Sequence, residues 1–481
     1  MLTTQQCQKA RMARDPRFDG KFFILVKSTG IFCRPVCKVR APLEKNVEYA
    51  FSAIDAMRQG FRPCLRCRPD SQPYSPPWQG VQTTAKRAAK LLTEDFSSSV
   101  GVIAERLGIS SRYLHKLMLE HWYVSPKQFR VCNQIMLAKR LLHHSNMSIE
   151  QVATSAGFSS ARQLQYHMKA LMQLTPSQVR SASKSSQTGT EKTALSNNAG
   201  AQHHDKLRDD KLEMTNIFLP YQGAYNWQAI RDFFSRRLIQ NNEAIDNDSF
   251  TKTFNIHDHA VKVRMQHVQA SSGFEVSFNQ SYLSYTHLII ERVQHVLDLH
   301  ANPYVIVDAL KSSGLPTKFI DAGMRIPGIC SQFEAGVRAI LGQQVSVSAA
   351  ITQLNRLVKG LNENNESFIK PQQVVNSDLA FIKLPQARKN ALKAFSEYMC
   401  TQTDSIEHDV SACLSIKGIG PWTVNYIKMR ASRHTDMWLE TDLIIRQKAS
   451  EIEKRGLKFS PDNAAPWRSY LTLGLWHLNF N

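Results

Sequence analysis

The sequence predicts a multidomain chain, mainly α-helical with α/β parts, and three observations lead to this. At 481 residues, the chain is long enough for two to four domains with their own cores. Cysteines near the N-terminus have the spacing of a metal site, and two similar helix–turn–helix units follow them. A polar stretch from Ser181 to about Asp210 then leads to a long segment with a β-rich start, and we expect this stretch to be flexible.

The first element is a predicted zinc site. Two basic stretches, GIFCRPVC and GFRPCLRC, carry the spacing Cys-x3-Cys, 26 residues, Cys-x2-Cys. Two such pairs of thiolates can close one tetrahedral site. We therefore predict one Zn²⁺ bound by Cys33, Cys37, Cys64 and Cys67, and no organic cofactor. A purely structural zinc site is the alternative, and disulfides are less favoured because nothing in the chain signals secretion.

The charge distribution predicts a nucleic-acid partner. Residues 1–181 hold 27 Lys and Arg against 11 Asp and Glu, whereas residues 182–481 hold 33 against 29. So concentrated a positive charge suits a polyanion, although a basic surface without a partner is the simpler alternative. No apolar run is long enough to cross a bilayer, which excludes a membrane partner. The other five cysteines are scattered, as in a cytoplasmic protein.

The chain has two predicted linkers. SQPYSPPWQG at 71–80 is rich in proline and predicts a short stiff connection, and the polar stretch is the second linker, 181–214. These breaks leave a first domain at 1–78 and a helical domain at 81–180. The remaining part begins at 215.

The helical domain contains two similar units, each a helix, a glycine turn and a second helix. The turns lie near Gly108 and Gly157, and Ser110 and Ser159 are plausible N-caps. Such second helices can dock in a major groove, although small helical bundles give the same pattern. The candidate DNA-binding residues on these helices are Arg112, His115, Lys116, Arg162 and Gln163.

The cysteine motifs and the double helix-turn-helix, which ends in LTPSQVR, resemble the N-terminal part of the Ada family of alkylation-response regulators. The resemblance covers residues 1–181 and implies an AraC-type DNA-binding domain after the zinc domain. The glycine that usually precedes the Thr/Ser-Pro of each unit is missing, and Trp122-Tyr123 and Met172-Gln173-Leu174 stand there instead.

The Ada resemblance implies methyl transfer from a DNA methylphosphotriester to Cys33. A methylated phosphate is neutral, so it can approach an anionic site that repels an ordinary phosphate. Methylating Cys33 would remove one negative charge and relieve roughly 1 to 4 kcal/mol of repulsion with DNA. Arg40 and Arg62 match family positions against the phosphates. The implied outcome is promoter binding and transcription activation, with RNA polymerase as a partner.

The C-terminal part carries a helix-hairpin-helix motif, LSIKGIGPWTVNYIKMR. Gly418 and Gly420 expose backbone N–H groups, and Pro421 suits the first position of a helix. This motif binds DNA phosphates without reading the sequence. Asp442 follows 22 residues after Gly420, in LETD.

The hairpin and this aspartate resemble the helix-hairpin-helix DNA glycosylases. FEAGVRAILGQQVSVSAA and PWRSYLTLGLW narrow the resemblance to the AlkA-type 3-methyladenine glycosylases. It implies a TATA-binding-protein-like α/β subdomain at 215–325 and a glycosylase helical domain at 326–481. Asp442 matches the catalytic aspartate, which stabilises positive charge on the sugar or activates water. A plain N-cap is the alternative role for Asp442, and Asp436 lies off the motif.

The AlkA resemblance also implies a pocket for a flipped, electron-deficient base. Trp422, Tyr426 and Trp476 match its aromatic positions, and Phe233 matches less securely. Gln344 stands where relatives have a leucine that fills the gap left by the base. Lyase-type relatives carry a lysine at the place of Trp422, so we expect a monofunctional enzyme that leaves the strand uncut.

The sequence thus predicts a bifunctional alkylation-damage response protein that is cytoplasmic, bacterial and associated with the nucleoid. It would sense methylphosphotriesters, bind promoter DNA and excise alkylated purines from double-stranded DNA. One alternative is a transcription regulator whose glycosylase-like domain only binds DNA. Another is a glycosylase whose front half only tethers it to DNA.

Overall fold

The computed structural model describes residues 2–14, 18–37, 39–69, 81–186, 213–257, 259–362, 367–401 and 409–478. The chain forms two compact units, Met1–Asn133 and Gln134–Asn481, and each is described here by itself. The predicted linker at 71–80 and most of the second one, 187–212, lie outside the described residues. Among the helices that are described, none has the length and apolarity required to span a membrane.

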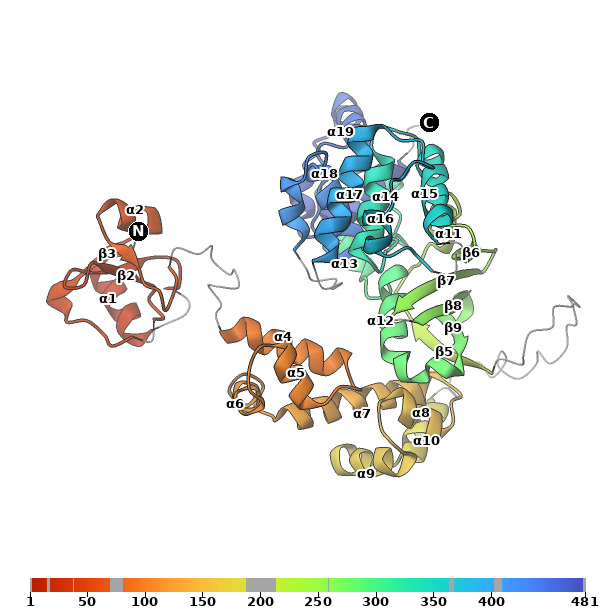
Figure 1. The fold of residues 1–481 in the computed structure, drawn as a ribbon, viewed down its shortest axis with the longest axis horizontal. Helices are drawn as coiled ribbons and strands as arrows, with labels where there is room; N and C mark the ends of the chain where they lie inside the picture. The colour runs from red at the N-terminus through yellow and green to blue at the C-terminus, as the bar shows by residue number, and fades with distance from the viewer. Residues whose placement is uncertain are drawn as a thin grey trace, which may run out of the picture. The chain divides into compact units, whose positions relative to one another are not determined.

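The N-terminal domain is a small sheet with short helices (Figure 1). Its strand order is β3-β1-β2-β4, from β1 (Phe23–Val26), β2 (Ile31–Cys33), β3 (Val47–Ala50) and β4 (Arg62–Pro63). The helices are α1 (Thr4–Ala13) and α2 (Ala53–Arg58). Phe23, Leu25 and Phe32 are buried on one side of the sheet, and Phe22 and Ile24 pack with the cysteines on the other. Alternation along β1 thus supplies two small cores.

The helical domain has the two predicted helix–turn–helix units. The first comprises α4 (Val81–Glu94), α5 (Val100–Arg106) and α6 (Ser111–Trp122), and the second α8 (Ile149–Ser155), α9 (Ala161–Met172) and α10 (Pro176–Ser186). Between them runs α7 (Pro126–His144), in which the boundary between the two compact units falls. Gly108 and Gly157 have the positive φ, +67° and +76°, that their turns require.

The helix ends of this domain agree only in part with the predicted caps. Ser110 caps α6 as predicted, but α9 is capped by Ser160 and not by Ser159. The Ser160 hydroxyl reaches the N–H of Gln163, whereas Ser159 instead donates to the Gln163 side chain. Tyr123 and Gln173 take the left-handed conformation in which helices commonly end on glycine.

The predicted second linker is too long at both ends. Helix α10 continues to Ser186, because SASKSS contains alanine and lysine and neither glycine nor proline stops the helix there. At the other end, β5 already begins at Met214.

The C-terminal part opens with a five-stranded antiparallel sheet of order β5-β9-β8-β7-β6. Its strands are β5 (Met214–Pro220), β6 (Glu243–Ile245), β7 (Ser249–Ile256), β8 (His259–Val268) and β9 (Gly273–Asn279). Three helices accompany it: α11 (Trp227–Ser235), α12 (Thr286–Val296) and α13 (Pro303–Ser312). Phe234 of α11 stacks on Phe250 of β7 with ring centroids 4.4 Å apart, so this helix packs on the sheet. The β-rich start is confirmed.

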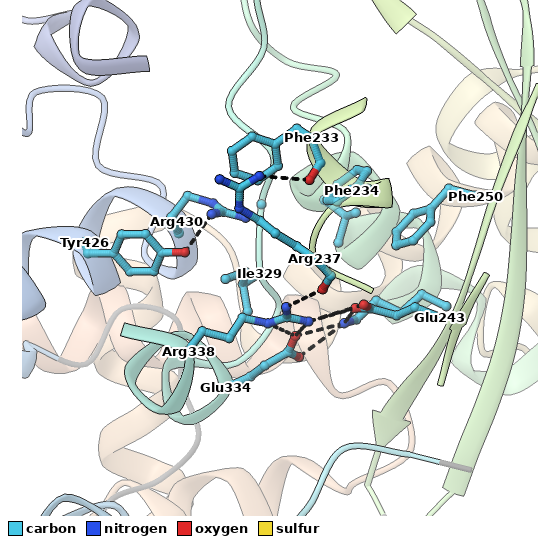
Figure 2. A pocket seen from close by; sticks show the side chains of 13 residues that line it. Phe233, Phe234, Arg237, Glu243, Phe250, Ile329, Glu334, Arg338, Tyr426 and Arg430 are labelled. Atoms are coloured by element: carbon cyan, nitrogen blue, oxygen red, sulfur yellow. Dashed lines mark hydrogen bonds and ion pairs between the residues drawn. The ribbon is translucent and has the colours of Figure 1, made fainter. Parts of the chain in front are cut away.

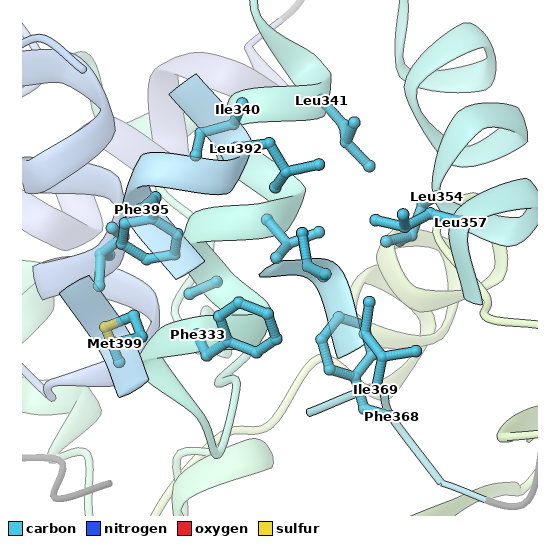
Figure 3. Packing of buried hydrophobic residues seen from close by; sticks show 14 of the residues in the cluster. Phe333, Ile340, Leu341, Leu354, Leu357, Phe368, Ile369, Leu392, Phe395 and Met399 are labelled. Atoms are coloured by element: carbon cyan, nitrogen blue, oxygen red, sulfur yellow. The ribbon is translucent and has the colours of Figure 1, made fainter. Parts of the chain in front are cut away.

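The remaining helices form the second subdomain. They are α14 (Gln332–Gly342), α15 (Val347–Leu361), α16 (Pro371–Val375), α17 (Gln386–Cys400), α18 (Pro421–Ala431), α19 (Leu443–Lys454) and α20 (Arg468–His477). Figure 3 shows their shared core, in which Phe333 of α14 stacks on Phe395 of α17 with centroids 6.1 Å apart. Helix α14 is buried along almost its whole length, as expected of a central helix.

A buried ion network joins the sheet to α14 (Figure 2). Lys252 lies on the inward face of β7, between Phe250 and Phe254, and only 6% of its side chain is exposed. Its ammonium contacts Glu243 of β6 and, at 3.0 Å, Glu334 of α14. Arg338, one turn along α14, lies 2.8 Å from Glu334 and 3.1 Å from Glu243. Two cations and two carboxylates thus neutralise one another away from water.

The electrostatics of Glu334 follow from this network. Burial alone would raise the pKa of this carboxyl, but Lys252 and Arg338 lower it to about 2. A carboxyl whose folded-state pKa is lowered stabilises the fold at neutral pH. This contribution is lost as the pH falls from about 5 to about 2, where the carboxylate is protonated.

We predict that Lys252→Met, which leaves two buried carboxylates facing one guanidinium, lowers the free energy of unfolding by about 3 to 5 kcal/mol. Chemical denaturation at pH 7 measures this. Lys359→Met, on the exposed side of α15, serves as the matched control and should change stability by less than about 0.5 kcal/mol. Equal stability of the two variants would contradict the assigned role of the network.

Candidate functional sites

The cysteine site is built by strand pairing. β2 and β4 are parallel neighbours, with Phe32 opposite Pro63, and the Cys64 N–H donates to the Phe32 carbonyl at 3.0 Å. Continuing this register places Cys33 beside Cys64. Cys37 and Cys67 follow in the tight turns after each strand, so the two halves of the motif meet.

The four thiols fit a tetrahedral zinc ion. Their sulfur atoms all lie within 4.8 Å of one another. Zinc–sulfur bonds of about 2.3 Å in a tetrahedron place sulfurs about 3.8 Å apart, so little movement is needed. Arg34 holds the site together: its guanidinium pairs with Asp19 and donates to the Cys67 carbonyl at 3.2 Å. The predicted ligand set is therefore brought together completely.

Backbone hydrogen bonds set two of the four sulfurs, those of Cys37 and Cys67, apart from the other two. The Arg34 N–H lies 3.4 Å from the Cys67 sulfur, and Cys37 accepts the N–H of Val39. A thiolate that accepts an N–H is a weaker nucleophile, because its charge is shared. Burial does not single out Cys33, which is 5% exposed, whereas Cys67 is the most open of the four. Arg40 and Arg62 are exposed, as phosphate contacts require.

The helix-turn-helix candidates lie on the exposed faces of the second helix of each unit. Arg112, His115 and Lys116 project from α6, whose opposite face buries Leu114, Leu117 and Met118. Arg162 and Gln163 begin α9 in the same way. The Gln163 side chain already accepts from the N–H and hydroxyl of Ser159, both at 3.0 Å, so it also closes the start of its helix.

The predicted hairpin is present between a 3-10 turn, Val410–Ser415, and α18. Gly418 has φ +94°, which a side chain would strain. Gly420 is the N-cap of α18, with Pro421 at the first helical position, and no atom lies within 4 Å of where its Cβ would be. The helix N-terminus is therefore open to a phosphate.

Asp442 is both an N-cap and part of a cleft wall. Its Oδ1 accepts the N–H groups of Ile444 and Ile445 at 3.0 and 3.1 Å, which begins α19. Its Oδ2 accepts the indole N–H of Trp422 at 2.9 Å. Asp436, the other candidate carboxylate, is instead held by Arg468 through bonds of 2.7 and 2.9 Å.

The predicted aromatic residues meet in the same cleft, whose volume is about 1010 Å³ and which we call the base cleft. The Trp422 and Tyr426 rings stack with centroids 5.4 Å apart, and the centroid of the Trp476 ring lies 6.5 Å from that of Tyr426. These side chains come from α18 and α20, and Asp442 lies at the cleft wall beside them. All four predicted residues therefore come together.

Phe233 also lines the base cleft, but it is 4% exposed and arginines cover it (Figure 2). The Arg237 guanidinium lies 3.8 Å from the ring centroid and that of Arg430 4.7 Å. Arg430 donates to the Tyr426 hydroxyl at 2.8 Å. Burial and the positive charges of the nearby Arg430 and Arg338 together lower the pKa of Arg237 to about 10.

Gln344 lies at the exposed turn between α14 and α15, with φ +56°. The preceding Gln343 side chain donates to the Gly418 carbonyl at 3.0 Å and to the Thr423 hydroxyl at 3.2 Å. The turn is thus tied to the hairpin, and Gln344 projects at its tip beside the base cleft.

Sequence reasoning missed five cations that line the base cleft: Arg236, Arg237, Lys318, Arg338 and Arg430. The available signals were weak. Arg237 follows Phe233 by one helical turn, and Arg430 ends the quoted hairpin motif, but neither position distinguishes a cleft residue from a surface residue.

Family models match three parts of the chain. Residues 6–70 match the metal binding domain of Ada, 103–182 a helix-turn-helix domain, and 216–331 the AlkA N-terminal domain. These matches confirm the predicted zinc, DNA-binding and AlkA-type parts in order along the chain.

Among curated relatives, a probable bifunctional transcriptional activator/DNA repair enzyme AlkA from Mycobacterium tuberculosis is 27% identical over 98% of this chain and 96% of its own. DNA-3-methyladenine glycosylase 2 of Escherichia coli is 25% identical over 54% of this chain and 96% of its own. The Escherichia coli bifunctional transcriptional activator/DNA repair enzyme Ada is 34% identical over 35% of this chain and 46% of its own. Along its length the chain is therefore similar first to the Ada metal binding and helix-turn-helix domains and then to the AlkA N-terminal domain, and the Mycobacterium tuberculosis protein resembles it over almost the whole chain.

Proposed function

We propose that the C-terminal part is a DNA glycosylase that removes alkylated purines, of the 3-methyladenine type, by hydrolysis of the N-glycosidic bond. One observation carries this proposal. The Asp442 carboxylate is fixed by three N–H donors in the wall of a cleft lined by Trp422 and Tyr426. A carboxylate beside stacked aromatic faces suits a flipped base and the positive sugar it leaves.

The reaction breaks the bond between C1′ of the sugar and the base nitrogen, and the oxygen of water joins C1′. Aromatic faces hold an electron-deficient base by stacking and by cation–π attraction. Asp442 lies where it can stabilise positive charge on the sugar or take a proton from water. Gly418 and Gly420 would hold a neighbouring phosphate, and Gln344 would enter the gap that the base leaves.

The N-terminal part would act as the damage sensor. The Cys33 sulfur attacks the methyl carbon of a methylphosphotriester, the sulfur–carbon bond forms, and the carbon–oxygen bond breaks to release an ordinary phosphodiester. A bound zinc ion would keep the four sulfurs deprotonated at neutral pH. Among the described residues, backbone N–H groups reach the sulfurs of Cys37 and Cys67 but not those of Cys33 and Cys64. This favours Cys33 or Cys64 as the nucleophile, and of these two the Ada resemblance implies Cys33.

The helix-turn-helix part would turn this methylation into transcription activation, with RNA polymerase as partner. Removing one negative charge at Cys33 favours DNA contact by Arg40 and Arg62. The exposed side chains of α6 and α9 would then dock in the major groove. A regulator whose C-terminal part only binds DNA is the second candidate, which the open hairpin at Gly420 would also suit.

We expect Asp442→Asn to lower base release from methylated duplex DNA by at least about 100-fold, because the negative charge is lost. Asparagine caps helices as well as aspartate does, so the fold should be retained. Chromatography of the released bases measures this. Asp436→Asn should keep the rate within about threefold, since this carboxylate forms only a half-exposed ion pair. No release by the parent protein would favour the DNA-binding regulator.

We expect the parent protein to take up one methyl group, on Cys33, after exposure to methylphosphotriester DNA. Mass analysis of its peptides locates the group without any variant that might lose zinc. Cys132, which is exposed and remote in sequence from the motif, should remain unmodified and serves as an internal control. A methyl group on Cys37, Cys64 or Cys67 would show that another thiolate is the acceptor.

We expect the enzyme to leave an uncut strand with an abasic site that only alkali cleaves, because Trp422 occupies the place of the lyase lysine. Denaturing electrophoresis before and after alkali measures this. Lys318 lines the base cleft and is exposed, so Lys318→Ala is the informative variant. Strand cleavage by the parent that Lys318→Ala removes would reveal a lyase built on a different lysine.

A further inference from the structure

A second hollow lies next to the base cleft and has a different character. It has a volume of about 400 Å³, and its charged residues are Arg356 of α15, Lys383 in the segment before α17, and Arg388 of α17. Leu341 and Val345 line both this hollow and the base cleft. The turn that carries Gln344 therefore separates the two. We call this second hollow the basic recess.

The basic recess contains three cations and no carboxylate among its lining residues. Within the part of the chain that the structure describes, no ion pair involves Arg356, Lys383 or Arg388. By contrast, the nearby Arg338 has two carboxylates within 3.1 Å. Three cations that line one hollow without a counter-ion repel one another, so an anionic ligand would stabilise them there.

The position of the turn between the two hollows indicates which anion the basic recess would bind. Gln343 ties the turn to the hairpin at Gly418, on the side of the base cleft, Asp442 and the damaged strand. Residues 344–349 are all exposed, so the turn and the start of α15 face outward. A duplex centred on Gln344 would present its damaged strand to the hairpin and its other strand across the turn.

We infer that the basic recess binds phosphates of the undamaged DNA strand, opposite the flipped base. This inference rests on the proposed glycosylase function and specifies how the enzyme holds a duplex. Gln344 would fill the gap between the strands, with the hairpin on one side and the recess on the other. Holding both backbones keeps the duplex open while the base occupies the cleft.

The test is the full-length triple variant Arg356→Ala, Lys383→Ala and Arg388→Ala. Each phosphate contact contributes about −0.9 to the slope of log affinity against log salt concentration. Losing three contacts should therefore make this slope less steep by about two to three. For a duplex with one alkylated base, kcat/KM should fall at least about tenfold, mainly through KM. For the same damaged strand without its complement, kcat/KM should stay within about twofold of the parent value.

The matched control removes three cations elsewhere, by Lys359→Ala, Lys454→Ala and Lys458→Ala. These exposed residues belong to neither hollow, so this variant should treat the duplex as the parent does. If the two triple variants behave alike, the inference is wrong. Equal losses on single-stranded and duplex DNA would place the three cations on the damaged strand and also overturn it.

Neutral methylphosphonate linkages, placed one at a time in the undamaged strand, locate the contact. In the parent, two or three such linkages near the site opposite the lesion should weaken binding to a duplex that carries an abasic-site analogue. In the recess variant, the same linkages should have no further effect, and an unchanged effect would contradict the inference. This binding assay requires no catalysis, so it still tests the recess if the parent protein releases no base.

Discussion

The geometry of the C-terminal part depends on the burial of one ammonium group. Lys252 lies on a sheet face between two phenylalanines, where an unpaired charge would cost several kcal/mol. Glu243 and Glu334 offset this cost, and Glu334 belongs to α14. Pairing therefore fixes α14 against the sheet in one register.

Because α14 is held against the sheet, the candidate functional residues at its end are also held in place. Arg338 of the network also lines the base cleft, and the helix ends one residue before Gln343. The Gln343 side chain then donates to the Gly418 carbonyl, so the turn that carries Gln344 and the hairpin glycines are positioned together. Hydrophobic contacts alone tolerate small shifts of a helix, whereas four interlocked charges do not.

Capping and catalysis are compatible at Asp442, although from the sequence they are alternatives. One carboxylate oxygen accepts two backbone N–H groups and the other the Trp422 indole. These donors orient the carboxylate before any substrate arrives, which is what electrostatic catalysis requires. The hydrogen bonds that cap the start of α19 therefore also orient the Asp442 carboxylate.

The zinc ligands and the hairpin could be predicted because their signals are local in the sequence: two short cysteine spacings and one Gly-x-Gly-Pro. The parallel pairing that brings Cys33 beside Cys64 is not visible, since it joins strands 31 residues apart in register. Ser159 and Ser160 are adjacent, and which of them caps α9 depends on the residue at which the helix begins. The arginines around Phe233 depend on tertiary packing, which no periodicity reports.

The arginines at the base cleft pose an apparent conflict with a cationic alkylated base. At about 6 Å and a dielectric constant of about 20, each guanidinium repels such a base by roughly 3 kcal/mol. During bond cleavage, however, the positive charge moves from the base to the sugar. In the proposed reaction, repulsion by Arg237 and Arg430 would then decrease, while attraction by Asp442 would increase.

Interactions that improve between ground state and transition state accelerate a reaction, whereas uniform binding does not. Cations beside the base and a carboxylate beside the sugar would both stabilise the transition state more than the ground state. The Arg430 guanidinium is also tied to this cleft by its hydrogen bond to the Tyr426 hydroxyl, at 2.8 Å. If the cleft holds a cationic base, as proposed, Arg237 and Arg430 would therefore favour bond cleavage in addition to packing on Phe233.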